Sequence, residues 1–439
     1  MSDFLNVGDY VSSDQKRFRV LKELGEGGQG RVYCVSEGEQ LYALKWYNKL
    51  ASSKKQYEAI QMLIEKGAPS EKFIWPVAVV EGSSPDNFGY VMPLINTKKY
   101  SKLALYFSGE VKAKRFETLI DACLQMAEAF YDLHLSGLCY RDISFGNLFI
   151  NFETGDVLIC DNDNVTFDSL TSTDDTWGTN GFMAPEVLKG ESPPSSQTDL
   201  FSLSVVLFRM LHLQHPLQGQ REYEVLITDH ETELELYGRN PIFIYDPVDG
   251  TNRPVKGKKD IADAYWPYYP EALQKRFIEA FTAGLHDPHA RVRESIWIRE
   301  MSILKAQLHY CYECGAQMFY DYPRLKNCPS CGAAIKTIAP RLKIGDRVLM
   351  LNHDTVLYSN QMDTAHILDH STPYAKIEVH PVHTKVWGLR NLSDSVWRYV
   401  NAQGEMKTIE KNGVVPIVHE LEVQFGTQTG IIRAMWQKK

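Results

Sequence analysis

The sequence has no apolar run close to the length of about 20 residues that a membrane-spanning helix requires, so we expect no membrane segment. It has no excess of basic residues either. The formal net charge of -8 argues against bulk binding to nucleic acid or to acidic membranes. Residues Met1 to Phe4 do not begin a signal peptide. These absences predict a cytoplasmic protein that contacts neither membrane nor nucleic acid.

Cysteine is scarce, with eight residues in a chain of 439. Half of them are scattered through apolar segments, where we expect reduced core thiols: Cys34, Cys123, Cys139 and Cys160. Such usage fits a reducing compartment. The length allows two or three domains, and 44% hydrophobic with 23% charged residues is typical of a globular protein.

The N-terminal stretch from Phe18 to Tyr47 alternates apolar and polar residues around a glycine-rich turn. This pattern predicts antiparallel strands. Glycines let a backbone approach phosphate oxygens and offer its N–H groups to them, and the turn has the residues Gly25, Gly27, Gly28, Gly30 and Val32. Lys45 ends a later apolar strand, where an unpaired charge is costly. We expect a carboxylate partner on the helix predicted for Ser53 to Lys66.

Two acidic residues follow apolar segments in the middle of the chain. Asp142 precedes Asn147 by five residues, in a loop after the helix predicted for Phe116 to Ser136. Asp161 follows the apolar run that starts at Val157. Phosphoryl transfer needs one carboxylate to accept a hydroxyl proton, and an amide with a second carboxylate to hold magnesium.

The order of these elements resembles the G-x-G-x-x-G-x-V, H-R-D-x-x-x-x-N, D-F-G and A-P-E series of protein kinases. The chain is similar to a bacterial Ser/Thr kinase of the eukaryotic type over residues 15–306. The resemblance implies an α+β fold of two lobes, residues 1–95 and 96–306. It also implies ATP and Mg²⁺ as cofactors.

The resemblance also implies roles for individual residues. Asp142 would position and deprotonate the hydroxyl, and Asn147 with Asp161 would bind Mg²⁺. Lys45, paired with Glu58 or alternatively Glu65, would orient the α- and β-phosphates under the glycine-rich turn. Two residues near the hinge between the lobes would line the adenine pocket: Met92 and Leu94.

Further matches concern structural residues of the larger lobe. The helix that begins near Thr198 resembles the central kinase helix, in which Asp199 would brace the catalytic loop. Arg291 would pair with Glu186 of Ala184-Pro185-Glu186. His134 is expected to be a core or surface residue and not a ligand.

Four positions depart from the kinase pattern. Ser144 stands where a Lys usually helps to hold the γ-phosphate, and Asp163 replaces the Gly of D-F-G. Tyr140 and Asn162 replace the His and Phe that stack in the family, so we predict a hydrogen bond between the two. The alternative to a working kinase is a pseudokinase that binds nucleotide or a partner and signals by conformation.

The substrate class follows from the segment before Glu186. Phosphotransferases that act on small molecules also lack the Lys, but they generally lack A-P-E, so its presence favours a protein substrate. Thr179 matches a position seen in Ser/Thr kinases. Autophosphorylation would be sought in a run of hydroxyl residues: Ser169, Thr171, Ser172, Thr173 and Thr176.

The remaining cysteines form two C-x-x-C-G motifs, with thirteen residues between Cys314 and Cys328. These are Cys311, Cys314, Cys328 and Cys331. Four thiolates complete a closed tetrahedral Zn²⁺ site with no open position, so the metal should be structural. We expect a zinc ribbon over residues 307–340.

The last segment, residues 341–439, reads as short strands separated by turns, which predicts a β-sandwich. The predicted strands are Arg347–Leu351, Ala375–Val379, Lys385–Leu389, Val396–Tyr399 and Glu420–Phe425. The region weakly resembles forkhead-associated domains, but their phosphothreonine-binding signature is not evident. With the ribbon, it also resembles a metal-binding module of bacterial tellurium-resistance and stress-response proteins. We expect it to dock a partner protein or to regulate the kinase.

Overall fold

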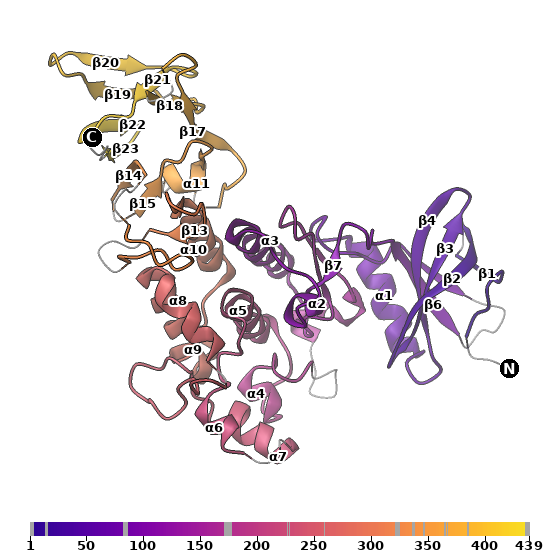
Figure 1. The fold of residues 1–439 in the computed structure, drawn as a ribbon. Helices are drawn as coiled ribbons and strands as arrows, with labels where there is room; N and C mark the ends of the chain where they lie inside the picture. Colours follow the sequence, from indigo (N-terminus) through magenta and orange to yellow (C-terminus); the bar gives the residue numbers. More distant parts are fainter. Residues whose placement is uncertain are drawn as a thin grey trace.

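The computed structural model describes residues 4–13, 16–81, 87–170, 178–225, 227, 229–258, 260–320, 325–335, 339–345, 347–363, 366, 368–383 and 386–434. A β-rich lobe, a helical lobe, a short cysteine-bearing hairpin and two C-terminal sheets follow one another along a bent, elongated molecule (Figure 1). No helix within these ranges has both the length and the apolar character needed to cross a membrane.

The N-terminal lobe is a closed antiparallel barrel with the strand order β1-β2-β3-β4-β6-β5. Its bounds are β1 Tyr10–Ser12, β2 Arg17–Gly27, β3 Gly30–Glu37, β4 Gln40–Tyr47, β5 Ala78–Glu81 and β6 Phe88–Pro93. Apolar side chains such as Phe18, Val35 and Trp46 form one core, as alternation along a strand requires. The predicted antiparallel strands around the glycine-rich turn are confirmed.

The apolar residues from Phe73 to Val80 also predict a strand in the sequence, and this prediction is mostly wrong. Only its last residues belong to β5, because the residues before Ala78 pack against helices instead. The indole of Trp75 donates to the Leu63 carbonyl at 2.8 Å, and Phe73 packs edge-on against Phe130. Helix α1 (Lys54–Lys66) begins as predicted, because the Ser53 hydroxyl accepts a hydrogen bond from the backbone N–H of Gln56.

The helical lobe is built around α3 (Phe116–Leu135) and α5 (Ser196–His212), both largely buried. The other α-helices are α2 Leu103–Phe107, α4 Pro185–Leu188, α6 Gln220–Tyr223, α7 His230–Glu233, α8 Glu271–Ala280, α9 Ala283–His286 and α10 Glu294–Ala306. Short 3-10 or π turns are η1 Asn162–Asn164, η2 Asp168–Leu170, η3 Leu234–Arg239, η4 Ile261–Ala264, η5 Trp266–Tyr268 and η6 Pro288–Ala290. Helix α5 starts at Ser196, because Ser195 and Thr198 form a capping box.

Two small sheets hold the loops that carry the acidic residues. Strands β7 (Ser101–Lys102), β9 (Leu148–Ile150) and β10 (Val157–Ile159) form one sheet in the order β10-β9-β7. Strand β8 (Leu138–Cys139) pairs with β11 (Thr166–Phe167). Residues 140–147 therefore join β8 to β9, and residues 160–165 join β10 to β11, so both loops are fixed at each end.

A short hairpin follows α10. Strands β12 (Leu308–Tyr310) and β13 (Gln317–Phe319) pair in antiparallel register. Phe319 belongs to the core of the helical lobe, where its ring lies against Phe116 and Tyr269. The base of the hairpin is therefore continuous with the helical lobe.

The C-terminal region forms two antiparallel sheets, of six strands in the order β15-β14-β23-β22-β19-β20 and of four in the order β16-β17-β18-β21. Its elements are β14 Arg341–Ile344, β15 Arg347–Met350, β16 Val356–Tyr358, α11 Ser359–Met362, β17 Pro373–Val379, β18 Trp387–Asn391, β19 Trp397–Val400, β20 Met406–Ile409, β21 Val414–Pro416, β22 Leu421–Phe425 and β23 Gln428–Arg433. One apolar cluster contains residues of both sheets, among them Leu342, Leu389 and Trp397. Five strands lie near predicted positions, although Lys385, where one was expected to begin, is outside the described residues.

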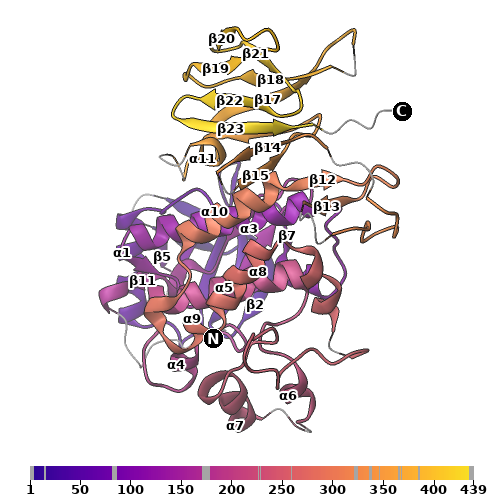
Figure 2. The ribbon, with the colours of Figure 1, turned by 90° about the vertical axis from the view of Figure 1, so that its left-hand side faces the viewer.

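The C-terminal region rests on the helical lobe, which Figure 2 shows directly beneath it. Side chains of α11 reach α10, where the Asn360 amide donates to the Ser302 hydroxyl at 2.8 Å and Gln361 donates to the Ser302 carbonyl at 3.2 Å. His370 forms an ion pair with Glu128 of α3 at 2.7 Å. Specific polar contacts therefore fix this region to the two long helices below it.

Candidate active site

A cleft of about 890 Å³ lies between the two lobes. The residues predicted to bind a nucleotide all line it: Gly25, Gly27, Gly28, Gly30, Val32, Lys45, Met92, Leu94, Asn147 and Asp161. Gly30 is required by packing, because a Cβ there would lie 2.0 Å from the Trp46 carbonyl oxygen. A Cβ at Gly25, Gly27 or Gly28 would meet nothing within 4 Å, so those residues leave the cleft open.

Asp142 lies at one end of the cleft, in the loop between β8 and β9. Its carboxylate accepts a hydrogen bond from the Thr179 hydroxyl at 2.6 Å and another from the Asn147 amide at 3.2 Å. Burial raises the pKa of Asp142, while the bonds from Thr179 and Asn147 oppose the rise. The carboxylate is therefore already aimed at a hydroxyl group and is a stronger base than an exposed aspartate.

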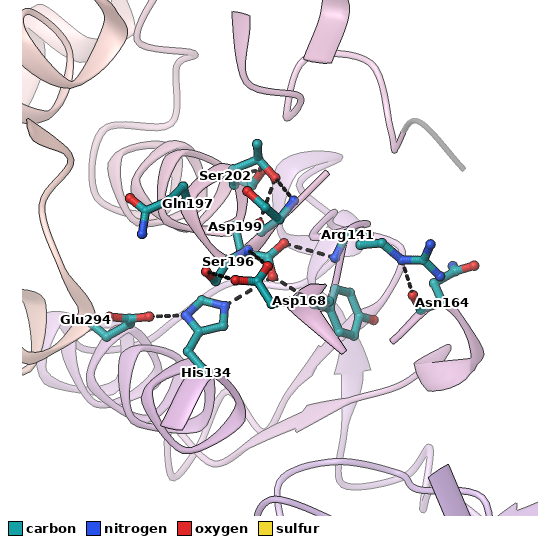
Figure 3. Close-up of polar contacts among 12 residues, drawn as sticks. His134, Arg141, Asn164, Asp168, Ser196, Gln197, Asp199, Ser202 and Glu294 are labelled. Carbon is teal, nitrogen blue, oxygen red and sulfur yellow. Dashed lines mark hydrogen bonds and ion pairs between the residues drawn. The ribbon is translucent and has the colours of Figure 1, made fainter. Parts of the chain in front are cut away.

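The backbone of this loop is held by Asp199 from the first turn of α5, as predicted (Figure 3). Its carboxylate accepts from the backbone N–H groups of Tyr140 at 2.6 Å and Arg141 at 2.9 Å. Arg141 has φ of 73°, a left-handed conformation that is costly for a residue with a Cβ. The bonds from Asp199 stabilise this conformation one residue before Asp142.

His134 lies between two carboxylates behind the same loop (Figure 3). One ring nitrogen contacts Asp199 at 3.1 Å and the other contacts Glu294 of α10. Burial alone would lower the pKa of His134, but the hydrogen bonds to Asp199 and Glu294 raise it to about 9. His134 is a buried cation that links α3, α5 and α10. The sequence predicted a core or surface histidine and gave it no partner.

Lys45 reaches across the cleft and contacts two carboxylates. Its Nζ lies 2.6 Å from Asp161 and 2.8 Å from Asp163, and it also donates to Gln29 of the glycine-rich turn at 2.9 Å. Burial alone would lower the pKa of Lys45, but the charges of Asp163 and Asp161 raise it. The lysine therefore remains protonated, as contact with phosphate oxygens requires.

The prediction that Glu58 pairs with Lys45 is wrong in this structure. Glu58 lies on the exposed face of α1 and pairs with Lys54 at 3.4 Å, and the alternative, Glu65, is also exposed. The residue of α1 that reaches toward Asp163 is Gln56, which lies one turn before the buried Ile60. A glutamine cannot neutralise Lys45, so the charge must come from elsewhere.

Asp163 supplies that charge. It is fully buried and accepts from the Tyr47 hydroxyl at 2.5 Å as well as from Lys45. Gln56 donates to the Tyr47 oxygen at 3.1 Å and to the Asp163 carbonyl at 3.2 Å. Although burial disfavours the carboxylate, Lys45 lowers its pKa. The sequence does show that Asp163 is unusual, because it places a charged side chain where the D-F-G motif has glycine.

Asp161 sits two residues away in a left-handed conformation with φ of 60°. Burial and the neighbouring charge of Asp163 raise its pKa, and Lys45 opposes the rise. Asp161 lines the cleft together with Asn147. An amide oxygen and a carboxylate are ligands that Mg²⁺ prefers, so the residues present fit the metal.

The predicted hydrogen bond between Tyr140 and Asn162 is wrong. The Tyr140 hydroxyl donates to the Cys160 carbonyl, and the Asn162 amide donates to the carbonyls of Ile74 at 2.9 Å and Ile159 at 3.1 Å. Each side chain satisfies backbone groups instead of the other residue. Tyr140 and Asn162 therefore form hydrogen bonds to the backbone where the family has a His stacked on a Phe.

The predicted pair of Glu186 and Arg291 is confirmed. Two guanidinium nitrogens of Arg291 contact the two carboxylate oxygens at 2.8 and 2.7 Å. Arg291 also donates to the carbonyls of Gln197 and Gly284. The pair anchors α4 to the loop that precedes α10. Of the predicted autophosphorylation run, Ser169 lies at η2, while Thr171, Ser172, Thr173 and Thr176 are outside the described residues.

The four clustered cysteines meet where the turn between β12 and β13 lies beside the turn that carries Cys328 and Cys331. Their sulfur atoms all lie within 4.8 Å of one another, with Sγ–Sγ distances of 3.9 Å for Cys311 and Cys331 and 3.8 Å for Cys314 and Cys328. Tetrahedral zinc with Zn–S bonds of about 2.3 Å has sulfur–sulfur edges of about 3.8 Å. The thiols are unbridged and their spacing matches such a site.

Comparisons with known proteins agree with this geometry. Protein kinase YegI of Escherichia coli O157:H7 is 24% identical over 355 residues, which cover 76% of this chain and 52% of YegI. DNA damage-responsive serine/threonine-protein kinase RqkA of Deinococcus radiodurans is 27% identical over 218 residues, 48% of this chain and 32% of RqkA. Serine/threonine-protein kinase PknD of Protochlamydia amoebophila is 26% identical over 240 residues, 46% of this chain and 23% of PknD.

The chain thus spans about half or less of the length of these relatives. The family model described as protein kinase domain matches residues 18–252, which is more than half of the 439 residues. That range begins in the β barrel and includes the loops of Asp142 and Asp161. The chain belongs to the protein kinase domain family.

Proposed function

We propose that the chain is an ATP- and Mg²⁺-dependent protein kinase that phosphorylates serine or threonine. The observation that carries the proposal is the Thr179 hydroxyl at 2.6 Å from Asp142, beside a cleft lined by Lys45, Asn147 and Asp161. A hydroxyl can therefore reach the carboxylate that would receive its proton. The serine/threonine kinases among the relatives support the same reading.

Each residue of the cleft has its own role in the proposed reaction. Asp142 orients the acceptor hydroxyl and takes its proton. Lys45 offers its charge to the phosphates, and the glycine-rich turn lines the same space. Asn147 and Asp161 would hold Mg²⁺, which neutralises phosphate charge when bound.

The substrate is proposed to be a protein. Ala184-Pro185-Glu186 lies next to Thr179 in the chain, and Glu186 is anchored by Arg291. This gives a rigid platform beside Asp142 that a peptide could follow. Small-molecule phosphotransferases generally lack this segment.

The direct test is transfer of the γ-phosphate from radiolabelled ATP to a generic protein substrate. Wild type should transfer label only with Mg²⁺ present, and Asp142→Asn should lose nearly all transfer because the amide cannot accept the proton. Asp156→Asn, which changes an aspartate of the nearby β9–β10 turn outside the cleft, serves as the matched control. Equal rates in Asp142→Asn and wild type would refute the assignment.

Two observations favour the pseudokinase alternative. Asp161 is engaged with Lys45 at 2.6 Å, and Ser144 leaves the loop without the usual lysine. A thermal-shift titration separates the two functions. A kinase should be stabilised by ATP only with a divalent ion, whereas stabilisation independent of metal would favour nucleotide sensing without transfer.

The cysteine cluster is proposed to bind one structural Zn²⁺, supported by the sulfur spacing given above. The two C-terminal sheets are proposed to be a β-sandwich that docks a partner protein or regulates the kinase. Their common core and their attachment to α10 and α3 support a separate module of fixed orientation. The free buried thiols Cys34, Cys123 and Cys139 support a cytoplasmic location.

A further inference from the structure

Arg209, in the last turn of α5, lies against the two segments that meet at the candidate active site. Its guanidinium is stacked over the ring of Phe145 at 4.1 Å and lies 5.1 Å from the ring of Phe182. Phe145 belongs to the loop of Asp142, and Phe182 follows Thr179 by three residues. The two rings also contact each other, with centroids 4.8 Å apart. Arg209 is therefore next to the place where a hydroxyl would be phosphorylated.

Among the described residues, the charge of Arg209 faces aromatic rings and no carboxylate. Within the described ranges it makes no ion pair, and its Nε is buried without a hydrogen-bond partner. Burial lowers its pKa from 12.5 to about 10, so the side chain is still a cation at neutral pH. Arg291, a more deeply buried arginine of this lobe, has a bidentate carboxylate. The contrast shows that Arg209 lacks the partner that a buried guanidinium normally has.

Arg209 faces a hollow of about 190 Å³. The hollow adjoins a smaller one that is lined by Asp142 and Thr179, and Met183 lines both. Two carboxylates also line the larger hollow, but Glu222 accepts from the Tyr237 hydroxyl at 3.1 Å and Glu233 accepts from Asn180 at 3.0 Å. Neither one forms an ion pair with Arg209.

We propose that Arg209 is a subsite for an anionic side chain of the protein substrate, a carboxylate or a phosphate close in sequence to the acceptor residue. The proposal rests on the protein kinase function proposed above. A guanidinium presents a planar fork that matches either anion in bidentate fashion. Because Arg209 is already desolvated and stacked on Phe145, an arriving anion would gain a fixed, partly buried partner without having to order a flexible cation.

The test measures peptide binding, so that it does not depend on phosphate transfer. Fluorescently labelled peptides carry one serine in an alanine and glycine background, and Asp, phosphoserine, Ala or Lys is scanned through the flanking positions. Fluorescence anisotropy with the full chain, Mg²⁺ and a non-hydrolysable ATP analogue gives the Kd. Wild type should bind Asp or phosphoserine at one position about tenfold tighter than Ala, and Lys more weakly than Ala. The Asp and phosphoserine arms show which anion is preferred.

Three variants assign the effect to Arg209. Arg209→Gln should bind the Asp, Ala and Lys peptides equally, and Arg209→Glu should prefer Lys. The matched control is Arg239→Gln, which removes an exposed arginine that pairs with Glu231 in the same lobe. It should keep the preference of wild type. Circular dichroism confirms that each variant is folded.

The outcomes separate this inference from the proposed function. Equal binding of acidic and basic peptides by wild type would overturn the subsite, and this measurement needs no variant. An acidic preference that survives Arg209→Gln would overturn it as well. If wild type shows the preference but transfers no phosphate from ATP, the kinase function fails and the subsite stands. If it transfers phosphate without the preference, only the subsite fails.

Discussion

At the scale of single residues, the site differs from its family chiefly in where the counter-charge of Lys45 comes from. Helix α1 offers Gln56, and the carboxylate is Asp163, two residues from Asp161 and in contact with the same lysine. Both acidic groups thus reside on one short segment. The position of Lys45 then depends on that segment and less on the placement of α1.

We predict that Asp163→Ala lowers the free energy of unfolding by about 3–5 kcal/mol, because it leaves Lys45 and the Tyr47 hydroxyl short of a buried partner. Glu58→Gln should change it by less than about 0.5 kcal/mol, since Glu58 is exposed. Urea unfolding measures both. Adding Gln56→Glu to Asp163→Ala should restore part of the loss, because the side chain at position 56 lies within hydrogen-bond reach of the Tyr47 hydroxyl and beside the segment of Asp163. A double variant no more stable than Asp163→Ala would contradict this account.

His134 gives a pH dependence whose sign follows from its surroundings. Its pKa is raised from 6.5 to about 9 in the folded protein, so the folded state binds the proton more tightly than the unfolded one. The stability it contributes is present in full below pH 6.5 and is lost as the pH rises through about 9. We expect the melting temperature to fall over this window.

His134→Gln should be less stable than wild type at pH 6 and should lose this part of the pH dependence. His366, an exposed histidine beside Asp363, provides the control, because His366→Gln should leave the profile unchanged. Differential scanning fluorimetry from pH 6 to pH 10 makes the comparison. A His134→Gln profile parallel to that of wild type would assign the titration to another group.

At the scale of elements, the contact between α4 and the loop before α10 depends on one ion pair. Arg291 is nearly inaccessible, with 2% of its side chain exposed. Glu186→Ala should therefore lower the free energy of unfolding by about 3–5 kcal/mol, because it strands a buried guanidinium. Glu191→Ala, which breaks an exposed pair with Lys189 nearby, should cost less than about 1 kcal/mol. Urea denaturation measures both free energies of unfolding. Equal losses in Glu186→Ala and Glu191→Ala would show that Arg291 finds another partner.

Elements with strong periodicity were predictable from the sequence, and side-chain partners often were not. The spacing of apolar residues placed α3 and α5 within about two residues, because a buried helical face is a local pattern. The strand predicted from Phe73 was mostly wrong, because these apolar residues pack against Phe130 and make only an isolated bridge to Ile159 among the described residues. The pairing of Lys45 failed for a similar reason: a helix can present Gln56 or Glu58, and only the packing of Ile60 and Leu63 decides which one faces the cleft.

At the scale of the whole molecule, the two C-terminal sheets are attached through α11 on α10 and through His370 on α3. The hairpin adds further contacts, with the Asn352 amide on the Leu308 carbonyl at 2.8 Å and the Tyr310 hydroxyl near Asp354 at 3.4 Å. The motif spacing in the sequence identified the four cysteines. It could not show that the base of the hairpin belongs to the kinase core through Phe319.

The base of the hairpin is held by Phe319 and the cysteine-bearing turns are not, so loss of zinc should affect mainly the turns. The cysteine-bearing turns have a very small apolar cluster, centred on Met318, so zinc binding would supply most of their folding free energy. Cys328→Ser should lower the zinc content from about one ion per chain and make the turns around residues 311–335 sensitive to protease. ATP binding and the docking of the C-terminal sheets should persist. Phe319 packs in the helical lobe and α11 contacts α10, and neither contact involves the metal. Cys34→Ser, which removes a buried thiol of β3, should keep its zinc.

Elemental analysis, limited proteolysis and small-angle X-ray scattering of the two variants test these expectations together. Full zinc content in a protease-resistant Cys328→Ser protein would show that the four thiols are not the metal site. Loss of nucleotide binding would mean that the turns support the kinase core beyond the contact of Phe319. An expanded scattering profile with ATP binding intact would instead show that the metal, and not α11, holds the sheets on the helical lobe. The structure predicts an unchanged profile, since the α11 and His370 contacts to α10 and α3 lie outside the cysteine turns.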